Sequence, residues 1–277
     1  MKFFHILLTV LLAAVVSWGV VSLTPGAVVT EKETALQRVL RTNTLRCGYI
    51  VWPPYLLKDV NTGQYSGVAY DFMSAIAREL EIKLEWVEEV GWGNFHEGLN
   101  AGRYDAMCVP VWQGGNRARI ALMTHPLYYN ALYALKRADD QRFATLEEVN
   151  KPGVRITVTD GSIEQNVRRL RFPNAEEVAL PQNTDSSQSI LSLATNKADI
   201  AFDNLTNANR YNETADRKLV MAGGQPVRVF ANVIAVKLGE DELANTLNAV
   251  IDALKTIGEG DVLAAKYAPD IMATAPR

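Results

Sequence analysis

The feature that most constrains the fold is an alternation of strand-like and helix-like apolar patterns along most of the chain. From Asp71 to Leu80 the large apolar residues recur every four positions, which predicts a helix that begins at Asp71. From Ile82 to Trp86 apolar and charged residues alternate, which predicts a strand with one wet face. Because strands that alternate with helices form parallel βαβ units, we expect an α/β fold with mostly parallel sheets flanked by helices.

The predicted elements fall into two sets of similar size, separated where the composition loosens near residues 138–140. Two such sets predict two lobes with a cleft between them. A helix over 163–170 is expected to bury Ile163, Val167 and Leu170, and the last long helix is expected to bury a stripe from Leu243 to Ile257. The predicted strands are 45–51, 82–86, 106–109, 133–136, 155–158, 178–180, 199–202, 218–221 and 233–236, and the other predicted helices are 31–41, 95–101, 189–194 and 205–210.

The segment 105–130 carries a candidate anion site. It begins as an apolar strand that we expect to break at Pro110, and it passes through Gly114 and Gly115, where the backbone turns at little steric cost. Arg117 follows the turn. An arginine at the carboxyl edge of a parallel sheet is well placed to meet an anion, whereas the alternative is a surface arginine on an ordinary loop.

The N-terminus predicts export from the cytoplasm. Lys2 precedes an uncharged, mostly apolar run over residues 3–23. The run is long enough to span a bilayer and lacks an Ala-x-Ala cleavage site, so residues 1–23 are either a cleaved signal peptide or a retained anchor in the inner membrane. In both cases the rest of the chain is periplasmic. The net charge of −3 lacks the positive excess that is typical of nucleic-acid-binding proteins.

The two cysteines, Cys47 and Cys108, each lie in an apolar, strand-like stretch. In an oxidising compartment they can pair if their strands are neighbours. The alternative, which we favour from the sequence, is two buried free thiols.

A series of short motifs resembles the type 2 periplasmic binding proteins, in particular the extracellular solute-binding proteins of family 3 that serve polar amino acid ABC transporters. Each motif alone is weak, and their order and spacing together are typical of the fold. The series comprises Leu-Arg-Cys-Gly at 45–48, Trp-Pro-Pro-Tyr at 52–55, Gly-Val-Ala-Tyr-Asp at 67–71, the stretch 105–117 with Pro126 beyond it, Gly-Ser at 161–162 and Lys-Ala-Asp-Ile-Ala-Phe-Asp at 197–203.

The resemblance implies a two-lobed molecule in which the chain crosses between lobes twice, at strands 133–136 and 232–237. Residues 24–43 would then be a linker and a short helix. Lobe 1 would comprise residues 44–135 and 231–277, and lobe 2 would comprise residues 136–230.

The resemblance also implies a ligand site. Arg117 matches the arginine that clamps the ligand α-carboxylate, and Ser162, at a predicted helix N-terminus, would help to hold the same group. Asp203 matches the acid that receives the α-ammonium group. Trp52 and Trp92 match two aromatic residues that sandwich the ligand.

The chain departs from the family pattern next to the arginine. The family usually carries a hydroxyl three residues before the arginine, where this chain has Gly114, and the small polar positions after the strand are Val109, Pro110 and Trp112. These changes remove hydrogen bonds to the carboxylate and add a third indole. They favour a ligand with an organic cation or a flat apolar group, unless Trp112 packs only against its own lobe.

The leading functional hypothesis is a solute receptor that closes over an amino acid or a related zwitterionic or cationic molecule and delivers it to an ABC permease. A second hypothesis is an enzyme on the same scaffold, since the fold also resembles periplasmic cyclohexadienyl dehydratases. Such an enzyme needs a proton donor, for which Glu164, His96 and His125 are the candidates. A third is a membrane-anchored sensor or accessory subunit, which would require a separate partner chain.

No cofactor or metal site is expected. The three histidines have no paired spacing, and the sequence contains no Gly-x-x-x-x-Gly-Lys loop.

Overall fold

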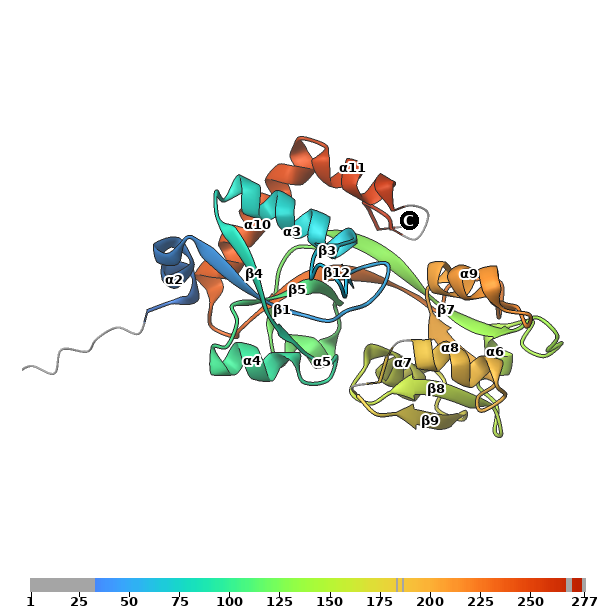
Figure 1. Ribbon diagram of the computed structural model, residues 1–277. Coiled ribbons are helices and arrows are strands. Elements are labelled where there is room, and N and C mark those ends of the chain that lie inside the picture. The colour runs from blue at the N-terminus through green and yellow to red at the C-terminus, as the bar shows by residue number, and fades with distance from the viewer. Residues whose placement is uncertain (1–32, 183, 186, 268–270, 276–277) are drawn as a thin grey trace, which may run out of the picture. The chain divides into compact units, whose positions relative to one another are not determined.

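The computed structural model describes residues 33–182, 184–185, 187–267 and 271–275, and within them strands and helices alternate as the sequence predicts (Figure 1). The strands are β1 (Thr44–Tyr49), β2 (Leu57–Lys58), β3 (Tyr65–Ser66), β4 (Lys83–Glu89), β5 (Ala106–Trp112), β6 (Leu122–Met123), β7 (Tyr128–Arg137), β8 (Arg155–Thr159), β9 (Glu176–Leu180), β10 (Ile200–Asp203), β11 (Leu219–Met221) and β12 (Arg228–Val236). The helices are α2 (Ala35–Thr42), α3 (Val68–Glu79), α4 (Phe95–Ala101), α5 (Gly115–Ala118), α6 (Leu146–Val149), α7 (Ile163–Arg171), α8 (Ser187–Ala194), α9 (Leu205–Thr214), α10 (Asp241–Thr256) and α11 (Glu259–Lys266).

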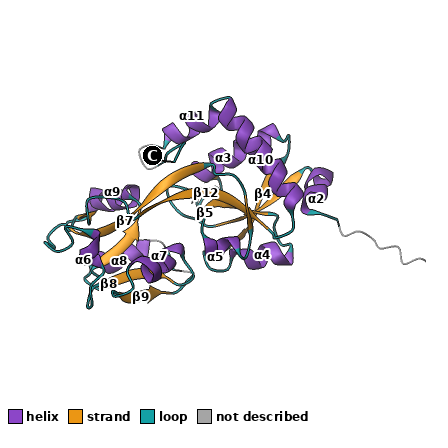
Figure 2. Ribbon diagram, turned by 180° about the vertical axis from the view of Figure 1, so that it is seen from behind, coloured by secondary structure: helices purple, strands orange, loops and turns teal. Residues whose placement is uncertain are grey.

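The sheet runs through both sets of elements in the order β4-β1-β5-β12-β7-β10-β8-β9. Strand β1 pairs in parallel with β4 and β5, and β8 pairs in parallel with β9 and β10, which confirms the expected α/β class with parallel pairing in each set. Helices flank the strands in both sets (Figure 2).

Strands β7 and β12 connect the two sets. Strand β7 pairs with β12 through residues 128–132 and with β10 and β11 through residues 133–137. Strand β12 leaves β7 and pairs with β5 through residues 232–236. The two strands run side by side between the two groups of elements (Figure 1). On this pairing we propose the boundaries given above, with lobe 1 at 44–135 plus 231–277 and lobe 2 at 136–230.

Two buried asparagines link these connecting strands to lobe 1. The Asn232 side-chain amide donates to Asn130 Oδ1 at 2.8 Å, and the Asn130 amide donates to the Tyr55 hydroxyl at 3.2 Å. Both asparagines are fully buried. Because buried polar groups are costly unless they are hydrogen-bonded, this chain of contacts fixes the strands against the loop that holds Tyr55.

The helix predicted to begin at Asp71 begins three residues earlier, at Val68. Its cap is Gly67, whose φ of 108° is rarely adopted by other residues, and a Cβ there would lie 2.6 Å from the Pro54 carbonyl oxygen. Asp71 therefore does not cap the helix. Its carboxylate instead accepts hydrogen bonds from Lys266 Nζ at 2.5 Å and the Tyr267 hydroxyl at 2.6 Å, which ties α3 to the C-terminal helix.

The strand expected to break at Pro110 continues through it to Trp112. Val111 pairs with Val233 and Met107 pairs with Ala235, so three residues of β5 face one residue of β12 in a bulge. Proline cannot donate to a sheet ladder, but at a bulge no donation is required of it. The bulge therefore carries β5 as far as the edge from which Trp112 and the following turn project.

Two apolar residues expected in the core are exposed. Leu170 is 73% exposed, because Phe172, just past α7, fills the core against Phe202 at a ring separation of 5.4 Å. Ile257 is 65% exposed, because α10 ends at Thr256 and its buried stripe is completed by Ile251 and Leu254. The helix periodicity was sound in both cases, and the error lies at the helix ends.

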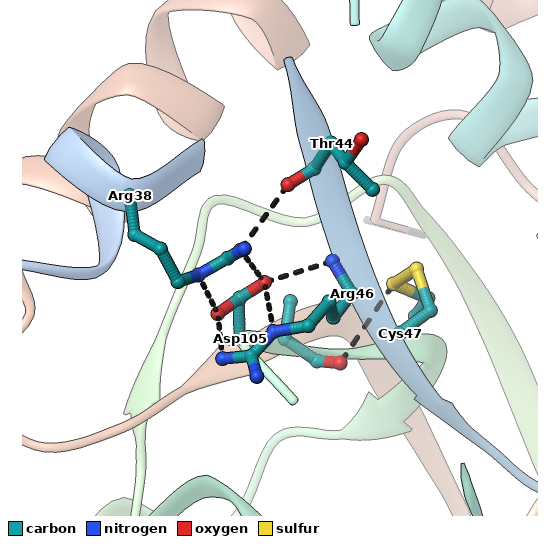
Figure 3. The surroundings of a disulfide bond; sticks show 7 residues. Arg38, Thr44, Arg46, Cys47 and Asp105 are labelled. Atoms are coloured by element: carbon teal, nitrogen blue, oxygen red, sulfur yellow. Dashed lines mark hydrogen bonds and ion pairs between the residues drawn. A yellow bond between two sulfur atoms is a disulfide. The ribbon is translucent and has the colours of Figure 1, made fainter. Parts of the chain in front are cut away.

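A buried aspartate holds the first strand of lobe 1 in register. Asp105 accepts from the Arg46 backbone amide at 2.8 Å, from the Arg46 guanidinium at 2.8 Å and from Arg38 Nε at 3.0 Å, and its own amide donates to the Arg46 carbonyl at 2.9 Å (Figure 3). Through Arg38 the same carboxylate fixes helix α2 to the sheet.

Lobe 2 repeats this arrangement. Asp199 accepts from the Arg155 backbone amide and from Arg155 Nε, both at 3.0 Å, and its own amide donates to the Arg155 carbonyl at 2.8 Å. Burial alone would raise the pKa of Asp199, but hydrogen bonds from Arg155 and Arg142 hold that pKa well below its usual range. Each lobe thus joins an aspartate before one strand to an arginine on the neighbouring strand.

Cys47 and Cys108 form a disulfide with a Cα–Cα distance of 5.3 Å, next to the Asp105 cluster (Figure 3). The favoured expectation of two free thiols is therefore wrong. The cysteines lie on β1 and β5, and the pairing of Cys47 with Ala106 makes these strands neighbours. The sequence patterns predicted both strands but not which strands are adjacent.

None of the helices in the described ranges has the length and apolar character needed to cross a bilayer. The run at residues 3–23, for which the sequence leaves signal peptide and anchor open, lies outside the described residues.

We expect the variant Cys47→Ala/Cys108→Ala to lose about 4 kcal/mol of unfolding free energy, because the cross-link no longer restricts the unfolded chain. Urea denaturation at neutral pH measures this loss. Dithiothreitol should destabilise the wild type and leave the double variant unchanged. Two thiols that react in the unfolded, unreduced wild type would contradict the pairing.

Candidate functional site

A cavity of about 50 Å³ is lined by side chains from both proposed lobes. Most lining residues lie at or just beyond the carboxyl ends of β5, β8 and β10, the edge at which parallel sheets bind ligands. Lobe 1 contributes Trp52, Trp92, Pro110, Trp112 and Arg117, and lobe 2 contributes Thr157, Val158, Thr159, Ser162, Ile163, Glu164, Thr184, Ser189, Phe202 and Asp203.

Arg117 is a buried guanidinium at this cavity. It lies in the short helix α5 and is 4% exposed, so the alternative of a surface arginine is wrong. Its Nη1 donates to the Trp112 carbonyl at 3.1 Å, and the guanidinium lies over the Trp92 ring at 5.6 Å from the centroid. Burial lowers the pKa of Arg117 to about 10, and the negative charge of Glu164 opposes that shift.

The hydrogen bonding of Arg117 is incomplete. Its Nε has no partner among the described residues, and none of their carboxylates forms an ion pair with it. A buried charge is costly unless it is paired and hydrogen-bonded. The guanidinium is therefore suited to receive an anionic group from outside the chain.

Asp203 ends β10 on the opposite side of the cavity. Its Oδ1 accepts from Asn207 Nδ2 at 2.9 Å and from the Asn204 backbone amide at 2.8 Å. Burial raises the pKa of Asp203 to about 7, against the effect of these hydrogen bonds, and the charge of Glu164 adds to the rise. A cationic group in the cavity would restore the ionised form.

The N-terminus of α7 also faces the cavity. Ser162 caps the helix, and its hydroxyl oxygen accepts from the Gln165 amide at 3.2 Å. Glu164 follows in the first turn. Burial raises the pKa of the Glu164 carboxyl, while hydrogen bonds from its own backbone amide and from Ser162, and the charge of Arg117, oppose the rise.

Three indoles form an aromatic wall. Trp52 stacks on Tyr55 with ring centroids 4.1 Å apart and meets Trp92 edge-on at 5.2 Å. Trp112 stacks on Phe230 at 4.9 Å and 6° between planes, so it packs against β12 as well as lining the cavity. Its Nε1 is buried without a hydrogen-bond partner in the described structure. Because an indole N–H is only a donor, it can bind an acceptor on a ligand.

Gly114 lies beside the cavity rather than in its wall. A Cβ on Gly114 would lie 2.8 Å from Ile163 Cδ1, and Ile163 itself lines the cavity. The isoleucine of lobe 2 thus fills the space where a side chain at position 114 would project. Of the predicted site residues, Trp52, Trp92, Trp112, Arg117, Ser162 and Asp203 line the cavity.

Several lining residues were missed by the sequence analysis. Thr157 is 1% exposed, and its Oγ1 has no partner within the described ranges. Thr159 lies two residues further on the same strand and face, so the period of two along β8 together with the strand-end rule could have identified both. Thr184 lies between β9 and α8, and Ser189 lies in the first turn of α8; no comparable sequence pattern marks either residue.

The candidate histidines lie elsewhere. His125 Nδ1 is 3.1 Å from the Asp252 carboxylate, and its side chain is 54% exposed. His96 contacts the Phe95 ring, and neither histidine lines the cavity. The described residues contain no cluster of three or more acidic, histidine or cysteine side chains suited to a metal ion.

Comparison with known proteins identifies a family. Residues 45–270 match the family described as bacterial extracellular solute-binding proteins, family 3.

Individual relatives are more distant. The chain is similar to the cyclohexadienyl dehydratase of Pseudomonas aeruginosa, with 24% identity over 61% of this chain and 63% of that protein, so the match spans less than two thirds of the relative. It is also similar to the L-arginine-binding protein of the same organism, with 24% identity over 78% of this chain and 84% of the relative. Among solved structures, an ancestral amino acid-binding protein that is a precursor of cyclohexadienyl dehydratase has a TM-score of 0.73 at 24% identity, with 85% of this chain and all (100%) of that chain covered.

We expect Asp203 to make the ligand-free protein less stable as the pH rises from about 4 to about 7. The raised pKa means that the folded form binds a proton that the unfolded form releases over this range, and one such proton corresponds to a slope of at most about 1.4 kcal/mol per pH unit. Urea denaturation across this range should show a smaller slope for Asp203→Asn. The exposed Asp139→Asn should follow the wild type, and equal slopes for wild type and Asp203→Asn would refute the assignment.

Proposed function

The chain belongs to the bacterial extracellular solute-binding proteins, family 3, and from this premise we propose that it is a receptor for an amino acid or a related zwitterionic or cationic small molecule. The observation that carries the proposal is the pair of buried, opposite charges at one cavity. Arg117 comes from lobe 1 and forms no ion pair with the described residues, and Asp203 comes from lobe 2.

The two charges suit the two ends of a zwitterion. A planar guanidinium matches a carboxylate with paired hydrogen bonds, and the carboxyl of Asp203 suits an ammonium group. Each ligand charge would relieve a group whose pKa burial has shifted toward the neutral form. The resemblance noted in the sequence assigns the same roles to these residues.

The aromatic wall supports a preference within this class. Trp52 and Trp92 both line the cavity, and their rings meet at 85°. An organic cation or a flat side group gains cation–π or stacking contacts there. The L-arginine-binding relative is consistent with such a ligand.

The contacts between lobes support a receptor that closes on its ligand. Arg210 Nη2 of lobe 2 donates to the Pro53 carbonyl of lobe 1 at 3.3 Å, and a Cβ on Gly161 would lie 2.8 Å from Gly93 Cα. Both contacts join the two proposed lobes, and the second is a close approach of two glycines. With only β7 and β12 connecting the lobes, few residues need to change backbone angles for the lobes to separate. We propose that the closed form delivers its ligand to an ABC permease.

The proposed location is outside the cytoplasm. The Cys47–Cys108 disulfide supports an oxidising compartment, and the family is described as extracellular. Whether residues 3–23 are removed or retained is tested by fractionation: a receptor recovered wholly in the soluble periplasmic fraction has no membrane anchor.

A second candidate is a dehydratase, favoured by two cavity carboxyls, Glu164 and Asp203, whose pKa values burial raises. The similarity to a cyclohexadienyl dehydratase points to the same alternative. Incubation with prephenate or arogenate distinguishes the two candidates. Formation of the aromatic product, lost in Glu164→Gln, would establish the enzyme.

The receptor is tested by thermal shift and calorimetry over a panel of amino acids, amines and betaines. We expect at least one to bind and to raise the melting temperature, because a ligand that binds only the folded state stabilises it. A panel that leaves the melting temperature unchanged would count against the receptor.

For the ligand found in that panel, we expect Arg117→Ala to weaken binding roughly 30-fold or more, because truncation leaves the ligand carboxylate buried without its partner. Arg117→Lys should also weaken binding, since a point charge does not reproduce the planar fork. The matched control is Arg119→Ala, because Arg119 follows closely and is exposed. Equal affinity of wild type and Arg117→Ala by calorimetry would exclude the proposed carboxylate site.

A further inference from the structure

Glu164 is a third charged residue of the cavity, and the proposed receptor leaves it without a role. It lines the same cavity as Arg117 and Asp203. A bound zwitterion would pair with one cationic side chain, Arg117, and one anionic side chain, Asp203. The second carboxyl at this site, that of Glu164, therefore affects how the ligand binds.

The position of Glu164 resembles that of a bound carboxylate. It lies in the first turn of α7, where backbone N–H groups and the partial positive charge of the helix favour an anion. Burial raises the pKa of its carboxyl, and hydrogen bonding by its own amide and by Ser162, together with the charge of Arg117, opposes that rise. These are the groups that the family resemblance assigns to the ligand carboxylate. In the free protein, the carboxyl of Glu164 lines the cavity beside these groups.

The other charged groups acting at this point are few. From lobe 1 the cation is Arg117, and from lobe 2 the acid is Asp203, whose pKa the charge of Glu164 helps to raise. Arg210 acts on Asp203. When a ligand carboxylate binds Arg117, it competes with Glu164 for this cation and places a like charge beside Glu164.

We propose that Glu164 takes up one proton from solvent when a carboxylate-bearing ligand binds, so that its O–H donates to the ligand carboxylate while Arg117 binds the same group. This inference rests on the proposed function and adds to it a proton-linked choice of ligand. The proton forms the O–H bond of the carboxyl and comes from water or buffer, with no other reactant. Of two carboxyls that share one site, one is commonly protonated for this reason.

The consequence for function is a pH-dependent affinity. A ligand with a carboxylate binds more tightly as the pH falls toward the range in which Glu164 is protonated in the free protein. Uptake of a whole proton changes the dissociation constant about tenfold per pH unit.

The test is calorimetry of L-arginine and L-glutamine binding at pH 8, in two buffers of different ionisation enthalpy, for wild type and Glu164→Gln. At pH 8 the carboxyl of Asp203, with a pKa of about 7, is largely ionised already, so its own titration contributes little. We expect uptake approaching one proton in the wild type and none attributable to position 164 in the variant. Between pH 7.5 and 8.5, where Asp203 is already mostly ionised, the affinity of Glu164→Gln should vary less with pH than that of the wild type.

The outcomes are distinguishable. Binding without proton uptake by the wild type overturns the inference and leaves the receptor standing, and so does uptake that persists in Glu164→Gln. If neither amino acid binds, the receptor for α-amino acids fails and the inference fails with it. Glu164→Ala, which also removes the titrating group, should reproduce the Gln result, and circular dichroism shows whether each variant is folded.

Discussion

The structure is organised around the cost of burying one guanidinium. Arg117 is enclosed by the Trp92 and Phe95 rings and holds the Trp112 carbonyl, yet its Nε has no partner among the described residues. A buried, incompletely bonded guanidinium is suited to a binding site, because an anionic ligand supplies the missing hydrogen bonds and the opposite charge. The aromatic rings serve two purposes, because they stabilise the cation through their faces and also wall the space into which the anion must come.

The position of this charge depends on two matching ion-pair clusters far from it. Asp105 with Arg46, and Asp199 with Arg155, each set the register between a first strand and its neighbour at the amino ends of the strands. With the strands fixed there, their carboxyl ends bring Trp112 and Asp203 to one cavity. The same pair of residue types in the same reciprocal arrangement occurs in both lobes, although the sequence shows no repeat of short period. Removal of either aspartate would take the carboxylate from a partly buried arginine on the neighbouring strand and loosen the frame that holds the site.

Local sequence patterns predict most of the strands and helices, but they predict only part of the candidate site. Helix 95–101 was predicted to the residue, and Arg117 and Asp203 were placed at strand ends by pattern and by family resemblance. Contacts between residues distant in the sequence determine the rest. The bulge opposite β12 lets β5 continue through Pro110. Asp71 contacts the C-terminal helix and therefore does not cap α3. Thr157 was missed because a threonine in a buried strand is common, and only the cavity shows that its hydroxyl lacks a partner. The adjacency of the two cysteine strands is likewise a property of the sheet order.

In the proposed receptor, closure of the lobes and the charge of the ligand act on the same three ionisable groups of the cavity. The cation of the cavity belongs to lobe 1 and both carboxyls belong to lobe 2, so the approach of the lobes removes all three from water together. Burial disfavours each charge, and the attraction between Arg117 and Glu164 and that between Arg210 and Asp203 offset this only in part, as the shifted pKa values of Arg117, Glu164 and Asp203 show. A ligand that adds one carboxylate and one cation changes the balance at both ends of the cavity. The lobes would then close most readily over a molecule whose charges, together with at most one proton, leave no buried carboxylate without a partner.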